Sequence, residues 1–423
     1  MMEDATTAEL TEKYVLGNYG RFPVTFSRGE GGYIWDEDGA KYLDFATGIA
    51  VCSLGHCPEV MQRALATQSA QLIHCSNLYL IREQAELARF VVKKMMARPG
   101  KVFFCNSGAE ANDSLIKLAR KRAFDKYGKG TSKNEVITCR QSFHGRTLGG
   151  IAATAQEKVK IGFDPLLPGF LHVPFNDPEA LREAVSDKTA AIMFEPIQGE
   201  GGINSATPEF MATAAELREK YDLLLMFDEV QCGAGRTGDW CGWRTILEGS
   251  GLDVEPDAVS WAKGFGGGFP IGAIWASDEC EGALGPGTHG STFGGTPLGS
   301  AVSLAVLEEI ERSGSLANVR RQEARIREAV SSWNISLIDS LRGVGLMLGF
   351  VLNEEAFAGV SGFSESGKTP SLFVVSEMMK AGMLTVPAGE RVVRWLPRLN
   401  VSDAEVDEAL SKFHSVLAGM ANS

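Results

Sequence analysis

The chain has 423 residues, a length that favours two domains and allows a sizeable buried core. Hydrophobic residues make up 44% and charged residues 22%, which is typical of a folded globular protein and excludes a mainly disordered or fibrous chain. Lysine and arginine number 41 against 53 aspartate and glutamate, so the net charge is -12, and no basic run interrupts this balance. Nucleic acid is therefore not expected as a partner, and an anionic substrate needs individually placed arginines.

Cysteine usage and the apolar pattern bear on location. The eight cysteines are scattered without a CxxC pair or a dense disulfide framework, which predicts reduced thiols and no metal site. The first residues are acidic and polar, without the basic and apolar regions of a leader, and no run of about 18 apolar residues occurs. We therefore expect a cytoplasmic protein that neither crosses nor binds a membrane.

Short apolar runs alternate with helical stretches between about residues 100 and 280, which predicts an α/β fold with a mainly parallel sheet covered by helices. The expected strands lie at residues 102–105, 136–139, 190–194, 223–227, 258–261 and 272–275. Beyond residue 299, amphipathic helices and strand-like runs predict a smaller α+β domain, with helices at 301–312 and 320–333 and strands at 345–352 and 392–396. The expected domains are a large one over 51–300 and a small one over 301–423, which the N-terminal segment 1–50 joins.

The first informative motif is a small polar turn after the strand at 102–105. Ser107, Gly108 and Ala109 lie at this turn, and a helical apolar repeat follows as far as Gly128. A strand, turn and helix in this order leave free N–H groups at the positive end of the helix, where a phosphate can bind. An ordinary capped helix explains the same residues, so the turn alone does not establish a phosphate site.

The second motif places Asp228 and Glu229 at the carboxyl end of the apolar strand at 223–227. A carboxylate that adjoins an apolar strand is partly desolvated and needs a positive partner to stay charged. A protonated pyridine nitrogen would serve. A salt bridge to a nearby arginine such as Arg236 is the alternative, and it is the commoner arrangement.

The third motif is Lys263, which follows the strand at 258–261 and precedes the glycines at 264, 266, 267 and 268. Glycine allows the backbone to approach a bulky ligand and to adopt unusual turns. A lysine at such a position can lose its proton and attack a carbonyl carbon. The alternative is a solvated lysine at the start of a loop.

In chain order these motifs provide a phosphate cradle, a carboxylate for a ring nitrogen and an amine for an aldehyde, which together describe pyridoxal phosphate. They resemble the motifs of the class III, or omega, aminotransferases of fold type I, and within them the acetylornithine branch. The similarity covers about residues 20 to 415. It implies a pyridoxal-phosphate-dependent transaminase of arginine biosynthesis, with the cofactor covalently bound to Lys263. The implied reaction moves the terminal amino group of an acylated diamino acid, N2-acetyl-L-ornithine, to 2-oxoglutarate and gives a semialdehyde and L-glutamate.

The resemblance also implies the site residues, among which Lys263 and Asp228 would be catalytic. The implied cofactor contacts are Ser107, Gly108, Ala109, Phe143, Asp228, Glu229, Val230, Gln231, Lys263 and Thr292. The implied substrate contacts are Tyr33, Arg146, Glu200, Ser291 and Arg394. Ser291 and Thr292 would reach the site of a neighbouring subunit, so the implied active unit is a homodimer.

Several of these roles are specific. Phe143 would stack on the cofactor ring, Gln231 would hydrogen-bond the ring hydroxyl, and Arg146 would bind a substrate carboxylate in a bidentate manner. Glu200 would neutralise Arg394 while the donor binds and release it for 2-oxoglutarate. The alternative for this last pair is a permanent structural ion pair.

Four positions depart from the acetylornithine pattern: Leu80, Thr296, Trp395 and Arg398. They leave other donors open, namely ornithine, succinylornithine, 4-aminobutyrate and an acylated lysine precursor, as well as an aminomutase of the same fold.

Alternatives from other functional classes also remain. Residues 233–238 fit G-x-G-x-x-G, a motif that is typical of dinucleotide-binding oxidoreductases. The residues that follow lack the helical pattern that would bind a pyrophosphate. A non-catalytic binding protein on the same scaffold is a further alternative, against which Lys263 and Asp228 argue.

Overall fold

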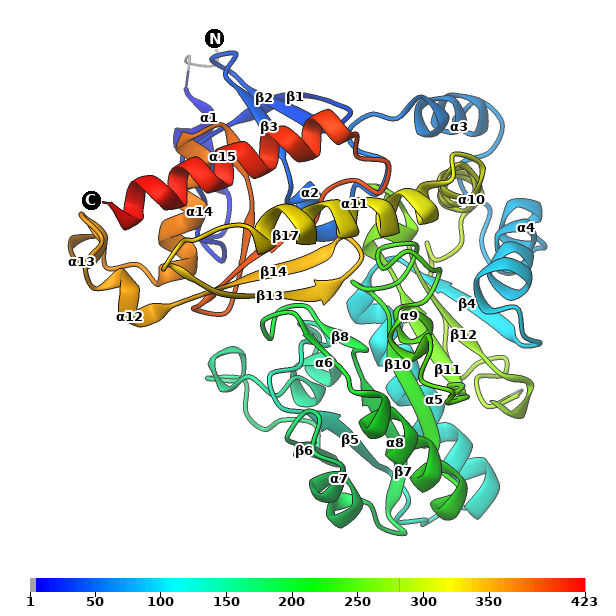
Figure 1. Ribbon diagram of the computed structural model, residues 1–423. Helices are drawn as coiled ribbons and strands as arrows, with labels where there is room; N and C mark the ends of the chain where they lie inside the picture. Colours follow the sequence, from blue (N-terminus) through cyan, green and yellow to red (C-terminus); the bar gives the residue numbers. More distant parts are fainter. Residues whose placement is uncertain (1–4, 281, 423) are drawn as a thin grey trace.

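A computed structural model describes residues 5–280 and 282–422. Its largest sheet has seven strands in the order β4-β12-β11-β10-β7-β5-β6 (Figure 1). All neighbours are parallel except β12, which is antiparallel to β11 and to β4. The strands are β4 (Lys101–Cys105), β5 (Glu135–Cys139), β6 (Phe170–Val173), β7 (Thr189–Phe194), β10 (Leu224–Asp228), β11 (Ala258–Trp261) and β12 (Gly272–Ala276).

The prediction of an α/β fold with a mainly parallel sheet is confirmed, and all the expected strands of this sheet are present to within one or two residues. Strand β6 was not expected. It lies at the edge of the sheet and carries His172 in a sequence of only four residues, so its apolar pattern is weak.

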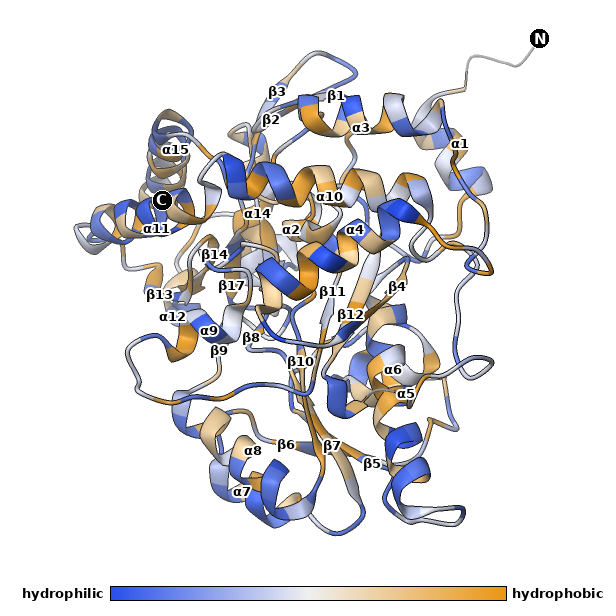
Figure 2. Cartoon of the chain, turned by 90° about the vertical axis from the view of Figure 1, so that its right-hand side faces the viewer, coloured by the Kyte–Doolittle hydropathy of each residue, from blue (hydrophilic) through white to orange (hydrophobic). Residues whose placement is uncertain are grey.

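Both faces of the large sheet are covered by helices, because side chains alternate between the two faces along each strand. Met193 and Met226 point to the face where Leu115 of α5 (Gly108–Tyr127) packs, and Phe194 and Phe227 point to the face of α8 (Pro208–Tyr221). Figure 2 shows apolar colour concentrated in β7 and β10, with more polar colour on the flanking helices. The sheet is therefore the middle layer of three.

Two smaller sheets lie in the upper left part of the view in Figure 1, away from β5, β6 and β7 of the large sheet. The N-terminal strands β1 (Phe26–Glu30), β2 (Tyr33–Asp36) and β3 (Lys41–Asp44) form one sheet with β15 (Met383–Leu384) from the C-terminal part. The other sheet has the order β13-β14-β17-β16, and its strands are β13 (Ile338–Val344), β14 (Met347–Leu352), β16 (Val386–Ala388) and β17 (Val392–Trp395). A further short pair consists of β8 (Ile197–Gln198) and β9 (Asn204–Ser205).

The remaining α-helices lie around these sheets. They are α1 (Thr7–Tyr14), α2 (Thr47–Ala50), α3 (Glu59–Ser69), α4 (Arg82–Phe90), α6 (Leu148–Ala153), α7 (Pro178–Ala184), α9 (Gly242–Leu247), α10 (Pro297–Arg312), α11 (Ser315–Ser331), α12 (Glu354–Phe357), α13 (Phe363–Ser366), α14 (Pro370–Lys380) and α15 (Asp403–Ala421). Within the described ranges, we find no helix with both the length and the apolar character that a bilayer span requires.

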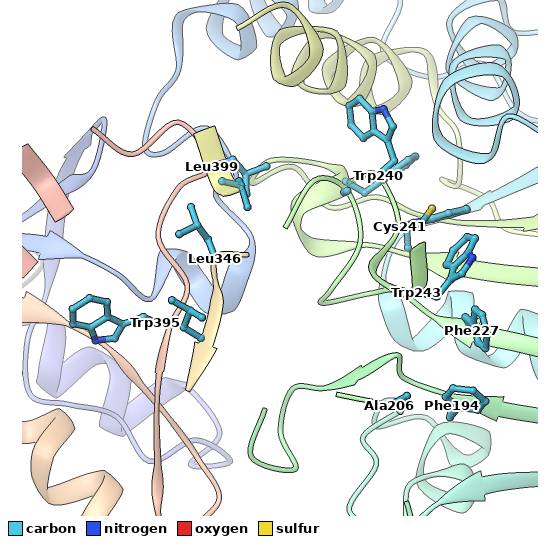
Figure 3. Close-up of a cluster of buried hydrophobic side chains, with 14 of the residues drawn as sticks. Phe194, Ala206, Phe227, Trp240, Cys241, Trp243, Leu346, Trp395 and Leu399 are labelled. Carbon is cyan, nitrogen blue, oxygen red and sulfur yellow. The ribbon is translucent and has the colours of Figure 1, made fainter. Parts of the chain in front are cut away.

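A single cluster of buried hydrophobic side chains joins the large sheet to the C-terminal part of the chain (Figure 3). It extends from Phe194 and Phe227 to Leu346, Trp395 and Leu399. Because close-packed cores resist displacement, this shared cluster fixes β17 relative to the large sheet. It thereby places Arg394, which lies on β17, next to the strand ends of that sheet.

Candidate active site

A cavity of about 460 Å³ lies at the carboxyl ends of strands β7, β10 and β11. This edge of a parallel sheet is where ligands generally bind. Many residues that were predicted from the sequence line the cavity, and they are Ser107, Gly108, Ala109, Phe143, Arg146, Glu200, Asp228, Val230, Gln231 and Lys263. The fold therefore brings together residues that are up to 156 positions apart, from Ser107 to Lys263.

Helix α5 begins beside this cavity and forms the predicted cradle for a phosphate. Ser107 is its N-cap, with an extended backbone, and the side chain accepts a hydrogen bond from the Glu110 N–H at 3.2 Å. The N–H groups of Gly108 and Ala109 lie in the first turn, where no helical carbonyl can accept from them. A β-carbon on residue 108 would lie 2.7 Å from Cγ1 of Val230, so the helix end packs directly against the cavity wall. These free N–H groups fit an anionic phosphate.

Asp228 ends β10 and is 3% exposed, with both carboxylate oxygens already oriented by neighbours. Oδ2 accepts from the side-chain amide of Asn112 at 2.7 Å and lies 2.8 Å from Nδ1 of His144. Oδ1 accepts from the Val230 N–H at 3.0 Å. The carboxylate is thus held rigidly at the cavity, as binding of a protonated ring nitrogen requires.

Arg236, the alternative partner for Asp228, makes different contacts. Its Nη1 donates to the carbonyl oxygens of Pro397 and Leu346, and the side chain is 2% exposed. Burial lowers the pKa of Arg236 to about 9. The explanation of Asp228 by an ion pair with Arg236 is therefore wrong.

His144 and Asn112 are functional neighbours that the sequence reasoning missed. Burial favours a lower pKa of His144, but the hydrogen bond and the charge of Asp228 outweigh it and raise that pKa. The side-chain oxygen of Asn112 accepts a hydrogen bond from the Ser260 hydroxyl at 2.7 Å, which fixes its amide toward Asp228. The sequence signal was the position of His144 directly after Phe143, which was already expected to contact the cofactor.

Lys263 follows β11 and reaches the same cavity. Its φ of 49° lies in the left-handed region, which is rare for a residue other than glycine. Burial lowers the pKa of its amine, an effect that the negative charge of Glu200 opposes. A β-carbon on Gly266 would lie only 2.1 Å from the carbonyl oxygen of Phe269, so the turn after the lysine requires glycine. A cavity-facing amine with a lowered pKa fits carbonyl chemistry better than a solvated surface lysine.

Arg394 lies behind Glu200 and forms a bidentate ion pair with it. The two N···O distances are 2.7 Å and 3.2 Å, and Arg394 is 1% exposed. Nη1 also donates to Oε1 of Gln231 at 3.1 Å, and Nε is buried without a partner among the described residues. Burial favours a higher pKa of Glu200, but Arg394 outweighs it and lowers that pKa.

Arg146 stands in contrast to Arg394. It lines the cavity but is exposed, and its guanidinium lies 5.4 Å from the centre of the Phe143 ring. The cavity thus combines an exposed arginine with a buried arginine that a carboxylate neutralises.

Two other predicted residues lie away from the cavity. The hydroxyl of Tyr33 on β2 donates to Oε2 of Glu408 at 2.8 Å. The carboxylate of Glu229 accepts from the backbone N–H groups of Gly242 and Trp243 at 2.8 Å and 3.1 Å, so its side chain fixes the start of α9.

Ser291 and Thr292 line a neighbouring hollow of about 940 Å³ instead of the cavity. Asn106 borders both spaces, and its side-chain amide donates to the Ser291 hydroxyl at 3.0 Å. Thr292 is exposed. Within one chain these two residues therefore lie beside the site without completing it.

The four positions that depart from the acetylornithine pattern do not line the cavity in the described part of the chain. Leu80 is fully exposed, and Thr296 caps the start of α10. Trp395 is buried among aromatic side chains, and Arg398 forms an ion pair with Glu405 at 2.8 Å. Three of these side chains therefore support the fold around the site.

The G-x-G-x-x-G run at 233–238 forms tight turns, and α9, the next helix, has only six residues and begins at Gly242. A pyrophosphate-binding motif requires the helix to begin within the glycine run. The oxidoreductase alternative is therefore excluded.

A phosphate cradle, an oriented buried carboxylate and a cavity-facing lysine at the edge of this sheet define a pyridoxal-phosphate-dependent enzyme. The sequence pattern of the class-III aminotransferases matches residues 14–417, and the chain belongs to this family. It is accordingly a transaminase whose cofactor is pyridoxal phosphate, as the sequence predicted.

Similar proteins agree with this assignment. The chain is 44% identical to the acetylornithine aminotransferase of Caldanaerobacter subterraneus subsp. tengcongensis, over 96% of this chain and 98% of that protein. It is 43% identical to the acetylornithine aminotransferase of Gloeobacter violaceus, over 98% of both chains. Among solved structures, the N-acetylornithine aminotransferase of Stenotrophomonas maltophilia superposes with a TM-score of 0.80 at 35% identity, over 97% of this chain and 98% of that one. The ornithine aminotransferase of Toxoplasma gondii gives a TM-score of 0.88 at 30% identity, over 97% and 94%.

Proposed function

We propose that this transaminase moves the terminal amino group of N2-acetyl-L-ornithine to 2-oxoglutarate and yields the corresponding semialdehyde and L-glutamate. The observation that carries the proposal is the Glu200–Arg394 ion pair at a cavity whose mouth also holds the exposed Arg146. Relatives named acetylornithine aminotransferase, at 40% to 44% identity over nearly the whole chain, support the choice of donor.

The cavity residues fit the cofactor in charge and position. When bound, pyridoxal phosphate supplies an aldehyde that takes up the amino group and a ring that accepts electrons from the substrate carbon. The chain would bind the phosphate at the start of α5, orient the ring nitrogen with Asp228 and cover the ring with Phe143. The residues assigned to this binding are Ser107, Gly108, Ala109, Phe143, Asp228, Val230, Gln231 and Lys263.

Lys263 has two tasks in this proposal. Its Nζ would hold the cofactor covalently at rest and, once free, would move a proton between the terminal carbon of the donor and the aldehyde carbon of the cofactor. A lowered pKa keeps a larger share of this amine neutral and able to accept the proton. The hydrogen bonds of Asn112 and His144 keep Asp228 in one orientation during both tasks.

The two arginines divide the two substrates between them. Arg146 binds the carboxylate of the donor at the cavity mouth, and the chain that ends in the amino group extends from there toward Lys263. Arg394 stays neutralised by Glu200 at this stage, so an apolar or acylated chain can pass. When 2-oxoglutarate binds, its second carboxylate replaces that of Glu200 on Arg394, and this exchange needs only the partly exposed Glu200 side chain to move.

A donor panel tests the proposal. The protein loaded with cofactor would be mixed with N2-acetylornithine, succinylornithine, ornithine, 4-aminobutyrate or an acylated lysine under single-turnover conditions, and the loss of cofactor absorbance would be followed. We expect N2-acetylornithine to react with the highest ratio of rate to half-saturating concentration, and 2-oxoglutarate to restore the absorbance. A higher ratio for another donor overturns the choice of donor. An isomerised amino acid formed without 2-oxoglutarate would instead identify an aminomutase.

The proposed active unit is a homodimer in the cytoplasm. Exposure of Thr292 and Phe293 at a hollow beside the cavity supports a second chain there, whose site Ser291 and Thr292 would reach. The cysteines are free thiols, as is usual in a reducing compartment.

A further inference from the structure

Two buried glutamates each directly follow the last residue of one of two neighbouring parallel strands. Glu195 follows β7 and is 6% exposed, whereas Glu229 follows β10 and is 1% exposed. Each carboxylate accepts hydrogen bonds from two backbone N–H groups. Burial raises the pKa of both carboxyl groups. The two carboxylates therefore share their backbone donors in kind, and they differ in the segments that they hold and in a Cys232 thiol that also donates to Glu229.

Glu229 holds the start of α9, outside the cavity, but Glu195 lines the cavity and holds two segments of its wall. Its Oε2 accepts from the Phe143 N–H at 3.1 Å, and its Oε1 accepts from the Gly199 N–H at 3.3 Å. Phe143 carries the ring that would cover the cofactor, and Gly199 immediately precedes Glu200. One carboxylate thus joins the cofactor wall to the segment that carries the ion pair.

The Gly199 side of this link continues to the buried arginine. A β-carbon on residue 199 would lie 2.4 Å from Nε2 of Gln231, so the backbone packs directly against that amide. Oε1 of Gln231 in turn accepts from Nη1 of Arg394 at 3.1 Å. A displacement of residue 199 would therefore shift Arg394, because Gln231 contacts both residues. It would also shift Glu200, which is the next residue in the chain.

The Phe143 side is closely packed as well. A β-carbon on Gly145 would lie 2.9 Å from that of Ala109, so the segment after Phe143 is pressed against the first turn of α5. The segment is thus held by the helix that would bind the phosphate and by Glu195. Loss of the Glu195 contact would remove the hydrogen bond that holds the backbone of Phe143.

We propose that Glu195 is a positioning residue that fixes the Phe143 ring relative to the Glu200–Arg394 pair, and so links cofactor binding to the choice between the two substrates. This inference rests on the proposed function, because it uses the roles assigned there to Phe143, Glu200 and Arg394. Glu195 acts through its neighbours, since both of its oxygens are taken by backbone donors. With residue 199 held, exchange of substrates moves the Glu200 side chain and leaves the main chain in place.

Glutamate suits this task better than glutamine does. A carboxylate offers an acceptor oxygen to each N–H group, whereas an amide offers one oxygen and turns an NH₂ donor toward the second N–H. Glu195→Gln therefore keeps the size of the side chain and breaks one of the two links. Glu195→Asp keeps the charge but shortens the reach, so that both links cannot form together.

The experiment compares Glu195→Gln with Glu229→Gln, in which an equally buried carboxylate loses the same kind of contact outside the cavity. For each holoenzyme we would measure the circular dichroism of the cofactor band, the dissociation constant of the cofactor and the single-turnover rate with each substrate. In Glu195→Gln we expect a changed dichroism band, weaker cofactor binding and a ratio of the two half-reactions altered by about ten-fold, the size of one lost charged hydrogen bond. In Glu229→Gln we expect a comparable loss of thermal stability with an unchanged ratio.

A uniform loss in both half-reactions of Glu195→Gln, with an unchanged dichroism band, would overturn the inference and leave Glu195 as a structural residue. The same ratio change in Glu229→Gln would also overturn it. If Glu195→Gln does not fold, Glu195→Asp provides the same comparison. Failure of the proposed function would look different, because the wild-type holoenzyme itself would then prefer another donor or would fail to react with 2-oxoglutarate.

Discussion

The cavity and the neighbouring hollow share Asn106 but differ in how their polar groups are held. In the cavity, Asp228 and Glu200 are tied to partners from other strands and helices. In the hollow, which has about twice the volume, Thr292 and Phe293 are exposed. The charged groups of the cavity are thus paired within one chain, whereas the hollow presents exposed side chains, which is why we propose that a second chain covers it.

The largest expected effect concerns the cavity alone. Lys263→Ala removes the amine that would hold the cofactor and move the proton, so turnover should fall by about a thousand-fold or more. The cofactor should still bind without a covalent bond, because the start of α5 and Asp228 are intact. Turnover and cofactor binding would be measured side by side.

Borohydride reduction of the wild-type holoenzyme followed by peptide mapping provides the control for this prediction. The tag should lie on Lys263. A tag on another lysine would show that the cavity has been assigned to the wrong amine.

The next largest effect is a difference between Arg394 and Arg146 in which half-reaction their removal slows. Arg394→Ala should slow the 2-oxoglutarate half-reaction far more than the donor half-reaction, by about ten- to more than a hundred-fold, since a charged hydrogen bond contributes ~1.5 to 3 kcal/mol. Arg146→Ala should mainly impair the donor. Glu200→Ala should leave Arg394 free, improve glutamate as a donor and weaken the acylated diamino acid.

Both half-reactions would be measured separately for each of these variants. Equal losses in the two halves for Arg394→Ala, together with an unchanged donor preference for Glu200→Ala, would reduce the pair to a permanent ion pair. Glu200 would then be as fixed in the cavity as Asp228 is.

A smaller effect tests whether the hollow serves a second chain. Lys263→Ala and Thr292→Ala should each be impaired, but a mixed dimer contains one site in which both defects meet and one intact site. Up to about half of the wild-type activity per dimer should therefore return on co-folding. Verified mixed dimers without recovered activity would contradict a shared site and make the hollow a feature of one chain.

The smallest effect lies outside both spaces, at the pair Asp44 and His56, whose closest N···O distance is 2.8 Å. The hydrogen bond and charge of Asp44 raise the pKa of His56 to about 10 in the folded chain, against about 6.5 when unfolded. A raised folded pKa contributes stability in full below about pH 6.5, and this contribution is lost as the pH rises through about 10.

Thermal unfolding of the wild type and of His56→Gln would test this window. The difference in melting temperature should be largest near pH 6 and should shrink toward pH 10, while the substrate preference stays constant. A difference that does not change with pH would disprove the linkage.

Much of the fold and of the site could be predicted, because the informative residues adjoin strands with strong apolar patterns. Asp228 ends such a strand and Lys263 follows another, and their place at the same sheet edge follows from the parallel arrangement. The antiparallel direction of β12 could not be predicted in this way, since apolar periodicity gives a strand its face but not its direction or neighbours.

The missed parts depend on contacts between distant segments. His144, Asn112 and Glu195 were overlooked because their importance lies in which atoms they meet, across 84, 116 and 52 positions respectively. Tyr33 shows the opposite case, in which a plausible site residue is occupied by a hydrogen bond to Glu408, 375 positions away. Side chains at such separations meet only through the tertiary fold.

The left-handed backbone at Lys263 has a consequence for how the chain can evolve. Glycine occupies this conformation freely, whereas a residue with a β-carbon is disfavoured by roughly 1 kcal/mol or more. The proposed reaction therefore requires lysine at a position where glycine would give the more stable fold. Without cofactor, the Lys263→Gly variant should have a higher melting temperature than the Lys263→Ala variant. Since natural proteins lie only slightly above the stability they need, substitutions elsewhere must offset this strain. A search for stabilised variants should leave residue 263 unchanged and draw its gains from surfaces far from the cavity.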